Sequence, residues 1–161
     1  SVIMTKIINK LNFILGIIFV IISIIPGKFL EHIARIIMTF VQIFFAYIPS
    51  PAGRGFIDII WESFVLEAFS TGVYCSTAIF LPIIIFDKFF KKTKINWTPS
   101  IIFLLLFFSY FGYEMLKILF LAISDPNVGF TDILRVIILI IGYCVGFMTP
   151  LYYAYNYTKS K

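Results

Sequence analysis

Charged side chains are scarce in this sequence. Only 13% of its 161 residues are Asp, Glu, Lys or Arg, whereas soluble domains carry about a quarter. A soluble chain of this size keeps roughly 30% of its extended surface in water. There are too few polar side chains here to cover such a surface, so the composition argues against a soluble domain.

Residues that commonly bind metals or act as nucleophiles are also few. His32 is the only histidine, and Cys75 and Cys144 lie in separate apolar runs with no second cysteine nearby. This pattern offers no zinc cluster, no axial ligand pair for haem and no disulfide framework. We therefore expect no metal and no cofactor. An enzyme is not favoured, because its chemistry would depend on Glu67 and Glu114 alone.

Apolar residues dominate the chain instead. Hydrophobic residues make up 61% of it and aromatic residues 19%, and the mean hydropathy is +1.02. The net charge of +5 comes from basic residues at the ends of apolar runs, where they face anionic lipid headgroups. A nucleic-acid-binding protein would instead gather them on one polar surface. The expected partner is thus the lipid bilayer and not nucleic acid.

The apolar residues form five long segments separated by short polar stretches. Each segment is long enough to cross a hydrocarbon core of about 30 Å as a helix rising about 1.5 Å per residue. We predict an all-α, polytopic membrane bundle that forms a single domain over residues 1–161. The predicted segments are residues 7–25, 29–48, 57–86, 101–123 and 133–155.

The second of these segments differs from the other four, which are predicted to span the membrane. Glu31, His32 and Arg35 lie in its first two turns, and Pro26 followed by Gly27 predicts a helix end just before it. Segment 29–48 either spans the membrane, lies in the interface or forms half of a re-entrant hairpin. The sequence leaves these alternatives open.

The distribution of lysine predicts the orientation of a multi-pass protein. The loop of residues 88–94 is rich in lysine, and Lys159 and Lys161 end the chain, so both regions are expected on the cytoplasmic (or matrix) side. The loop that contains Asp125 and Asp132 carries no Lys or Arg and suits the opposite side. Five spans would separate the N-terminus from the C-terminus, whereas a re-entrant second segment would place both on one side.

Ionisable residues inside membrane segments are costly in lipid, so they normally face protein or water and have partners. On the predicted topology, those of the last three segments fall in the outer half of the membrane. Glu114 and Lys117 are three residues apart and are expected to pair. Glu67 is the deepest acidic residue of its segment, and Arg135 is its expected partner. The predicted polar layer comprises Asp58, Glu62, Glu67, Glu114, Lys117, Asp132 and Arg135.

A turn rich in proline and glycine precedes the third segment. Gly53 and Gly55 flank Arg54, and glycines allow close approach of the backbone to a ligand. Such a turn can present amides and one arginine to an anion such as a lipid phosphate. The alternative interpretation is an ordinary tight turn between helices.

Small residues recur at four-residue spacing on two segments, which lets helix backbones approach closely. We therefore predict that the third and fifth segments pack together. The predicted contact residues are Ala68, Gly72 and Ser76 on the third segment and Gly142 and Gly146 on the fifth.

Two functions are compatible with these features. The first is a non-catalytic subunit of a larger membrane complex, which acts through helix packing and lipid contact and has other membrane subunits as partners. The second is a small transporter or a lipid-binding or lipid-translocating protein that uses the charged layer. The charges are either a structural set of ion pairs or the lining of a polar pathway, and the sequence does not decide between these.

Overall fold

A computed structural model describes residues 2–46, 58–89 and 95–160 of the chain. Almost all of these residues are helical, as the composition predicts. The elements are α1 (Val2–Ala46), the π-helical segment η1 (Trp61–Val65), α3 (Leu66–Phe89), α4 (Thr98–Ser124) and α5 (Phe130–Lys159). Residues 58–60 are also helical and run directly into η1, so residues 58–89 form one continuous helical rod.

Within the described residues, four helices are long and apolar enough to cross a membrane. Three of them correspond to the predicted segments 57–86, 101–123 and 133–155, and each continues a few residues further than predicted. The residues in these added turns are typical of helix termini. Pro99 lies in the first turn of α4, where proline is tolerated, and Asp132 and Lys159 lie in the first and last turns of α5, where their charges complement the helix dipole.

The helix end predicted at Pro26 is wrong, because α1 continues through it from Val2 to Ala46. Pro26 removes one backbone donor, but a turn would free several peptide groups in apolar surroundings, where unbonded groups are costly. Gly27 serves close packing and not a turn. A Cβ at this position would lie 2.9 Å from the Tyr74 ring and 3.0 Å from its carbonyl oxygen. Residues 7–25 and 29–46 therefore belong to one helix, and the 45 residues of α1 make it about 68 Å long at about 1.5 Å per residue.

α1 packs antiparallel along α3 and η1, on both sides of the proline. Contacts at three heights show this, because residues later in α1 meet residues earlier in the 58–89 rod. They are the ring pair of Phe19 and Phe86, the close approach of Gly27 to Tyr74, and the hydrogen bond from Gln42 to Glu62.

α5 lies between α3 and α4 and packs against both. On its α4 side, the Tyr143 hydroxyl donates a hydrogen bond of 2.8 Å to the Phe108 carbonyl oxygen. The Phe108 ring stacks on that of Phe147, with centroids 5.8 Å apart. Because α4 and α5 are consecutive and antiparallel, they form a helical hairpin.

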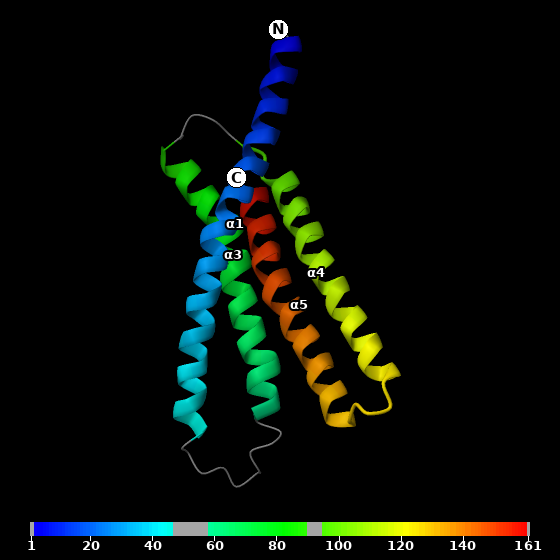
Figure 1. Cartoon of the computed structure of the whole chain (residues 1–161). Helices are drawn as coiled ribbons and strands as arrows, with labels where there is room; N and C mark the ends of the chain where they lie inside the picture. Colours follow the sequence, from blue (N-terminus) through cyan, green and yellow to red (C-terminus); the bar gives the residue numbers. More distant parts are fainter. Residues whose placement is uncertain (1, 47–57, 90–94, 161) are drawn as a thin grey trace.

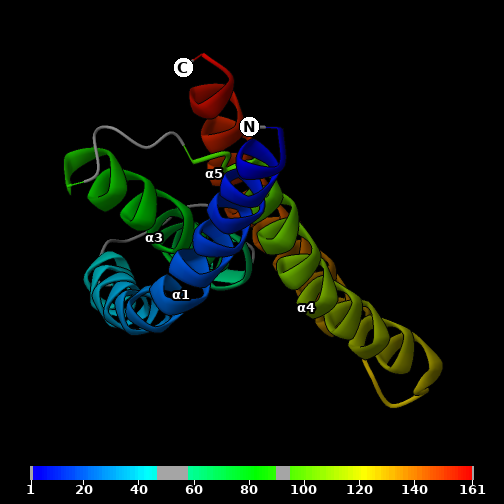
Figure 2. The same ribbon diagram turned by 90° about the horizontal axis from the view of Figure 1, so that it is seen from above.

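The helices run alternately up and down, so the N-terminus, the end of α3, the start of α4 and the C-terminus lie at one end of the molecule (Figure 1). A hydrogen bond of 3.3 Å from the Tyr157 hydroxyl to the Asp87 carboxylate joins α5 to α3 at this end. The first turns of α1 extend beyond the other helices here. Towards the other end, the α4–α5 hairpin points away from α1 and α3 (Figure 2). All four helices contribute to the buried core: Val20, Cys75, Ala78, Ile79, Ile83, Phe86, Trp97, Ile101, Leu104, Phe108, Tyr143, Phe147, Leu151 and Ala154.

Candidate functional site

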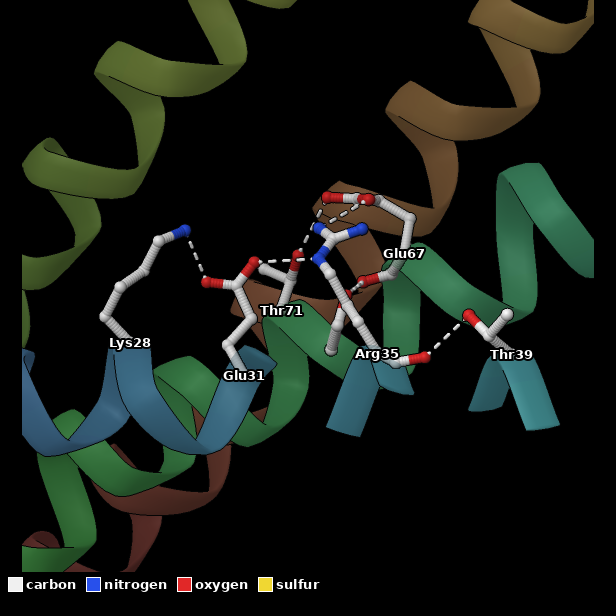
Figure 3. Close-up of polar contacts among 7 residues, drawn as sticks. Lys28, Glu31, Arg35, Thr39, Glu67 and Thr71 are labelled. Carbon is white, nitrogen blue, oxygen red and sulfur yellow. Dashed lines mark hydrogen bonds and ion pairs between the residues drawn. The ribbon is translucent and has the colours of Figure 1, made fainter. Parts of the chain in front are cut away.

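Four charged side chains form a continuous chain of ion pairs between α1 and α3 (Figure 3). Lys28 Nζ lies 2.6 Å from Glu31 Oε2, and Arg35 Nε lies 3.1 Å from Glu31 Oε1. Arg35 then reaches across to α3, where its Nη2 lies 2.9 Å from Glu67 Oε2. We call these four residues the α1–α3 ion chain. Its formal charge is zero, because two cations balance two carboxylates.

The spacing of the α1 residues puts them on one helix face. Glu31 is three residues after Lys28 and four before Arg35, and side chains three or four apart lie next to each other on a helix. The same face continues to Thr39, whose hydroxyl donates a hydrogen bond of 2.8 Å to the Arg35 carbonyl oxygen. Helical geometry alone therefore brings three members of the ion chain together.

The carboxylates of the ion chain are buried, whereas the cations reach the surface. The side chains of Glu31 and Glu67 are 5% and 8% exposed, against 34% for Arg35 and 53% for Lys28. Glu67 also accepts a hydrogen bond of 3.2 Å from the Thr71 hydroxyl. A buried carboxylate without a partner would be strongly unfavourable. In this structure, each of the two carboxylates is bonded to a cation of the α1–α3 ion chain.

Arg35, and not Arg135, is the partner of Glu67. The predicted pairing with Arg135 is wrong, because α1 covers the side of α3 on which Glu67 lies. Arg135 is exposed on α5. Glu31 and Arg35 were not predicted to be site residues, because a helix end at Pro26 would have placed them near a membrane surface. Their three- and four-residue spacing was the signal that could have found the ion chain.

The other members of the predicted polar layer fall into separate groups. Glu114 and Lys117 pair as predicted, with Nζ and Oε1 2.8 Å apart, on the exposed side of α4. Glu62 is exposed and accepts a hydrogen bond of 2.6 Å from Gln42. Asp58 is half-buried at the start of its helical rod, and Asp132 is exposed in the first turn of α5. The structure thus divides these charges among the 58–89 rod at its contact with α1, the outer side of α4 and the exposed first turns of α5.

The predicted contact between the third and fifth segments is confirmed as the packing of α3 and η1 on α5. A Cβ on Gly146 would lie 2.7 Å from the Ala68 carbonyl oxygen, and one on Gly142 would lie 2.7 Å from that of Phe64. Gly72 faces Gly146 less closely, since its Cβ would lie 3.6 Å from the Gly146 carbonyl oxygen. These glycines let the two backbones touch.

An open groove of about 500 Å³ runs beside this contact. Small and hydroxyl-bearing residues line it, Ser76 among them. Its lining is Ala68, Phe69, Gly72, Val73, Ser76, Thr77, Val145, Gly146, Thr149 and Pro150. The groove therefore offers hydroxyl groups but no charged side chain to a ligand.

The predicted anion-binding turn, with Gly53, Arg54 and Gly55, lies outside the described residues. So do residues 90–94 of the lysine-rich loop. In the described parts of the chain, no group of three or more His, Cys, Asp or Glu side chains is placed to hold a metal ion. Cys75 and Cys144 are free thiols, and the Cys75 thiol donates a hydrogen bond of 3.5 Å to the Phe147 carbonyl oxygen.

Comparison of the chain with models of protein families, with curated proteins and with solved structures gave no significant match. Its function is therefore inferred from the contacts described above.

Proposed function

We propose that this protein is a non-catalytic, multi-pass subunit of a membrane protein complex, in which it spans the bilayer four times and acts through helix packing and lipid contact. The length and hydropathy of α1, the 58–89 rod, α4 and α5 support a membrane location. Large apolar side chains on the outer faces of the helices support it as well. Phe40, Phe44, Phe120, Leu121 and Phe130 are each at least 68% exposed.

The neutral α1–α3 ion chain is the observation that carries the structural role. Ionisable groups inside a membrane can line a route for ions or protons. In the described residues, the two buried carboxylates, Glu31 and Glu67, are instead bonded to Arg35. Charges arranged in this way hold α1 to α3, which favours a packing subunit over a transporter.

The arrangement of the chain ends supports one orientation. With four spans, the N-terminus lies on the same side as the lysine-rich loop of residues 88–94 and the C-terminus. Lys6 and Lys10 then join the other basic residues, so the excess of positive charge falls on one side, as in the cytoplasmic regions of membrane proteins. We therefore assign this side to the cytoplasm (or matrix).

Membrane insertion and orientation can be tested together. The chain is expected to stay in the membrane pellet after alkaline carbonate extraction. In a background with Cys75→Ala and Cys144→Ala, a membrane-impermeant thiol reagent should label Lys10→Cys and Lys159→Cys from one side. It should label Asn127→Cys only from the other. Extraction by carbonate would contradict insertion, and labelling of Lys10→Cys and Lys159→Cys from opposite sides would contradict four spans.

The role as a subunit is tested by purification from the native membrane in mild detergent. We expect fixed membrane proteins to accompany the tagged chain in constant proportion. A Glu67→Gln variant should be less stable and should associate less with these partners, since the contact between α1 and α3 loses its ion pair. A chain that purifies without partners, and whose Glu67→Gln variant folds normally but no longer supports transport across vesicles, would contradict the proposal and favour a transporter.

A further inference from the structure

α4 carries a charged pair on the side that faces away from the rest of the molecule. Glu114 and Lys117 lie 2.8 Å apart, and their side chains are 43% and 50% exposed. Lys117 Nζ also lies 4.7 Å from the centroid of the Tyr113 ring. In the described residues, all these partners belong to α4 itself, whereas the α1–α3 ion chain joins two helices.

The pair does not lie at a helix end. Exposed Phe111 and Tyr113 precede it, and exposed Ile118, Phe120 and Leu121 follow it towards the end of α4. In a membrane-spanning α4, apolar side chains on both sides of the pair place it within the hydrocarbon region. Charged groups facing lipid at such a depth are unfavourable, and they normally face protein instead.

The outward stripe that includes Lys117 has the spacing of a helix–helix seam. Leu106, Tyr110, Tyr113 and Lys117 follow one another at intervals of four, three and four residues, which is the pattern of a heptad contact. The first three are between 56% and 66% exposed, so nothing in the described chain covers the stripe. Glu114 lies directly beside it.

We propose that this stripe of α4 is the contact surface for a second copy of the chain, with Glu114 of each copy paired to Lys117 of the other. The inference rests on the proposed membrane insertion and goes further by naming a partner. Self-complementarity carries it: Lys117 on the stripe and Glu114 beside it present one charge of each sign, so this surface is neutral and matches a copy of itself.

The geometry of a two-fold dimer suits this pairing. Two copies inserted in the same orientation are related by an axis along the membrane normal, so equal residues lie at equal depth. Glu114 of one copy then differs in depth from Lys117 of the other by three residues, about 4.5 Å along a helix. Side chains of this length bridge such an offset. Each carboxylate then meets a second cation, and the pair moves from a lipid-facing to a protein-facing surface.

Cysteine cross-linking locates the seam without altering the charges. In the cysteine-free background, Leu106→Cys should form a disulfide-linked dimer in the membrane. The neighbouring Leu105→Cys is the matched control, because it lies about 100° further round the helix. Equal cross-linking at both positions, or none at Leu106→Cys, would overturn the proposal.

Charge exchange between two differently tagged copies tests the pairing itself. In the Leu106→Cys chain, Glu114→Lys or Lys117→Glu alone should lower self-cross-linking by at least about tenfold, since like charges then meet. Co-expressed, the two variants should cross-link to each other. Pairing within one helix does not explain the return of cross-linking, because each variant carries two like charges at positions 114 and 117 of its own helix. As a control, Asp132→Lys makes the same change of charge on α5 and should leave cross-linking unchanged.

Three further outcomes would overturn the inference. Failure of the two variants to cross-link preferentially to each other is the first, and an equal loss with Asp132→Lys is the second. With either of these two outcomes, the proposed function still stands if the protein remains in the membrane after carbonate extraction. The third is extraction of the unaltered chain by carbonate, which overturns the membrane location as well.

Discussion

Two ion pairs of this protein share their chemistry but differ in their surroundings. Arg35 and Glu67 join α1 to α3, and the Glu67 side chain is 8% exposed. Glu114 and Lys117 lie on one helix, and both side chains are more than 40% exposed. Breaking a buried pair leaves an uncompensated charge inside the molecule, whereas breaking an exposed pair on one helix leaves the helix largely unaffected. The first pair therefore supports the fold, and the second is available to a partner.

The helices that carry these pairs differ in the same sense. In the most apolar 18-residue stretch of the 58–89 rod, 44% of the residues are buried inside the protein. In the corresponding stretch of α4, only 17% are buried. The rod contacts α1 on one side and α5 on another, whereas the described contacts of α4 are mainly with α5. In the proposed membrane location, protein therefore covers much of the rod, whereas lipid or a partner must cover most of α4.

The largest expected effect comes from removing the buried carboxylate. Glu67→Gln leaves Arg35 without its partner on α3, so we expect the free energy of unfolding in detergent to fall by about 3 kcal/mol, the lower end of the range for buried pairs because Arg35 is partly exposed. Glu114→Gln is the matched control and should change the same quantity by less than about 0.5 kcal/mol. Equal losses in the two variants would remove the distinction between the pairs.

The next effect concerns the contact of α3 with α5. Gly146→Ala forces a Cβ against the Ala68 carbonyl oxygen and the Thr71 side chain, so the free energy of unfolding should fall by about 2 kcal/mol. Gly72→Ala makes the same change in the same interface, where its Cβ has room. It should be neutral or slightly stabilising, because glycine is a poor helix former. Thermal unfolding of the two variants checks this difference.

A smaller effect is expected between α4 and α5. Tyr143→Phe removes the hydroxyl that donates to the Phe108 carbonyl oxygen and keeps the ring contacts. The free energy of unfolding should fall by about 1 kcal/mol. Tyr153→Phe, at an exposed position on the same helix, should have no measurable effect. A loss of similar size in both variants would show that the buried hydrogen bond is not its cause.

The smallest effect is expected at the proline of α1. Pro26→Ala restores a backbone donor to a helix that is already continuous, so the free energy of unfolding should stay the same or rise slightly. Side-specific labelling of Lys10→Cys should also remain unchanged. Movement of Lys10→Cys to the other side of the membrane would show that the proline makes a turn.

Contacts encoded by local spacing could be predicted from the sequence. Glycines four residues apart predicted the packing of α3 on α5, because a bare helix face permits close approach whatever the rest of the fold is. The pair of Glu114 and Lys117 followed from helical geometry alone. In both cases the deciding residues are close together in the sequence.

Contacts that depend on distant residues could not be predicted in this way. Proline followed by glycine usually predicts a helix end, but Gly27 is required by Tyr74, a residue of another helix. A helix end at Pro26 places Arg35 at the start of a separate segment, which leaves Arg135 as the expected partner of Glu67. A single misplaced helix end therefore accounts for the error in the number of helices and for the error in the ion pair.

A double-mutant cycle between Arg35 and Glu67 tests the central claim most directly. The free energy of unfolding is measured for Arg35→Gln, Glu67→Gln and the combined variant. We predict that each single change destabilises the protein and that the combined variant recovers at least about 1.5 kcal/mol relative to their sum, as expected for residues in contact. Losses that add to within about 0.5 kcal/mol would show that the two residues act independently. That result would contradict the structural role of the α1–α3 ion chain.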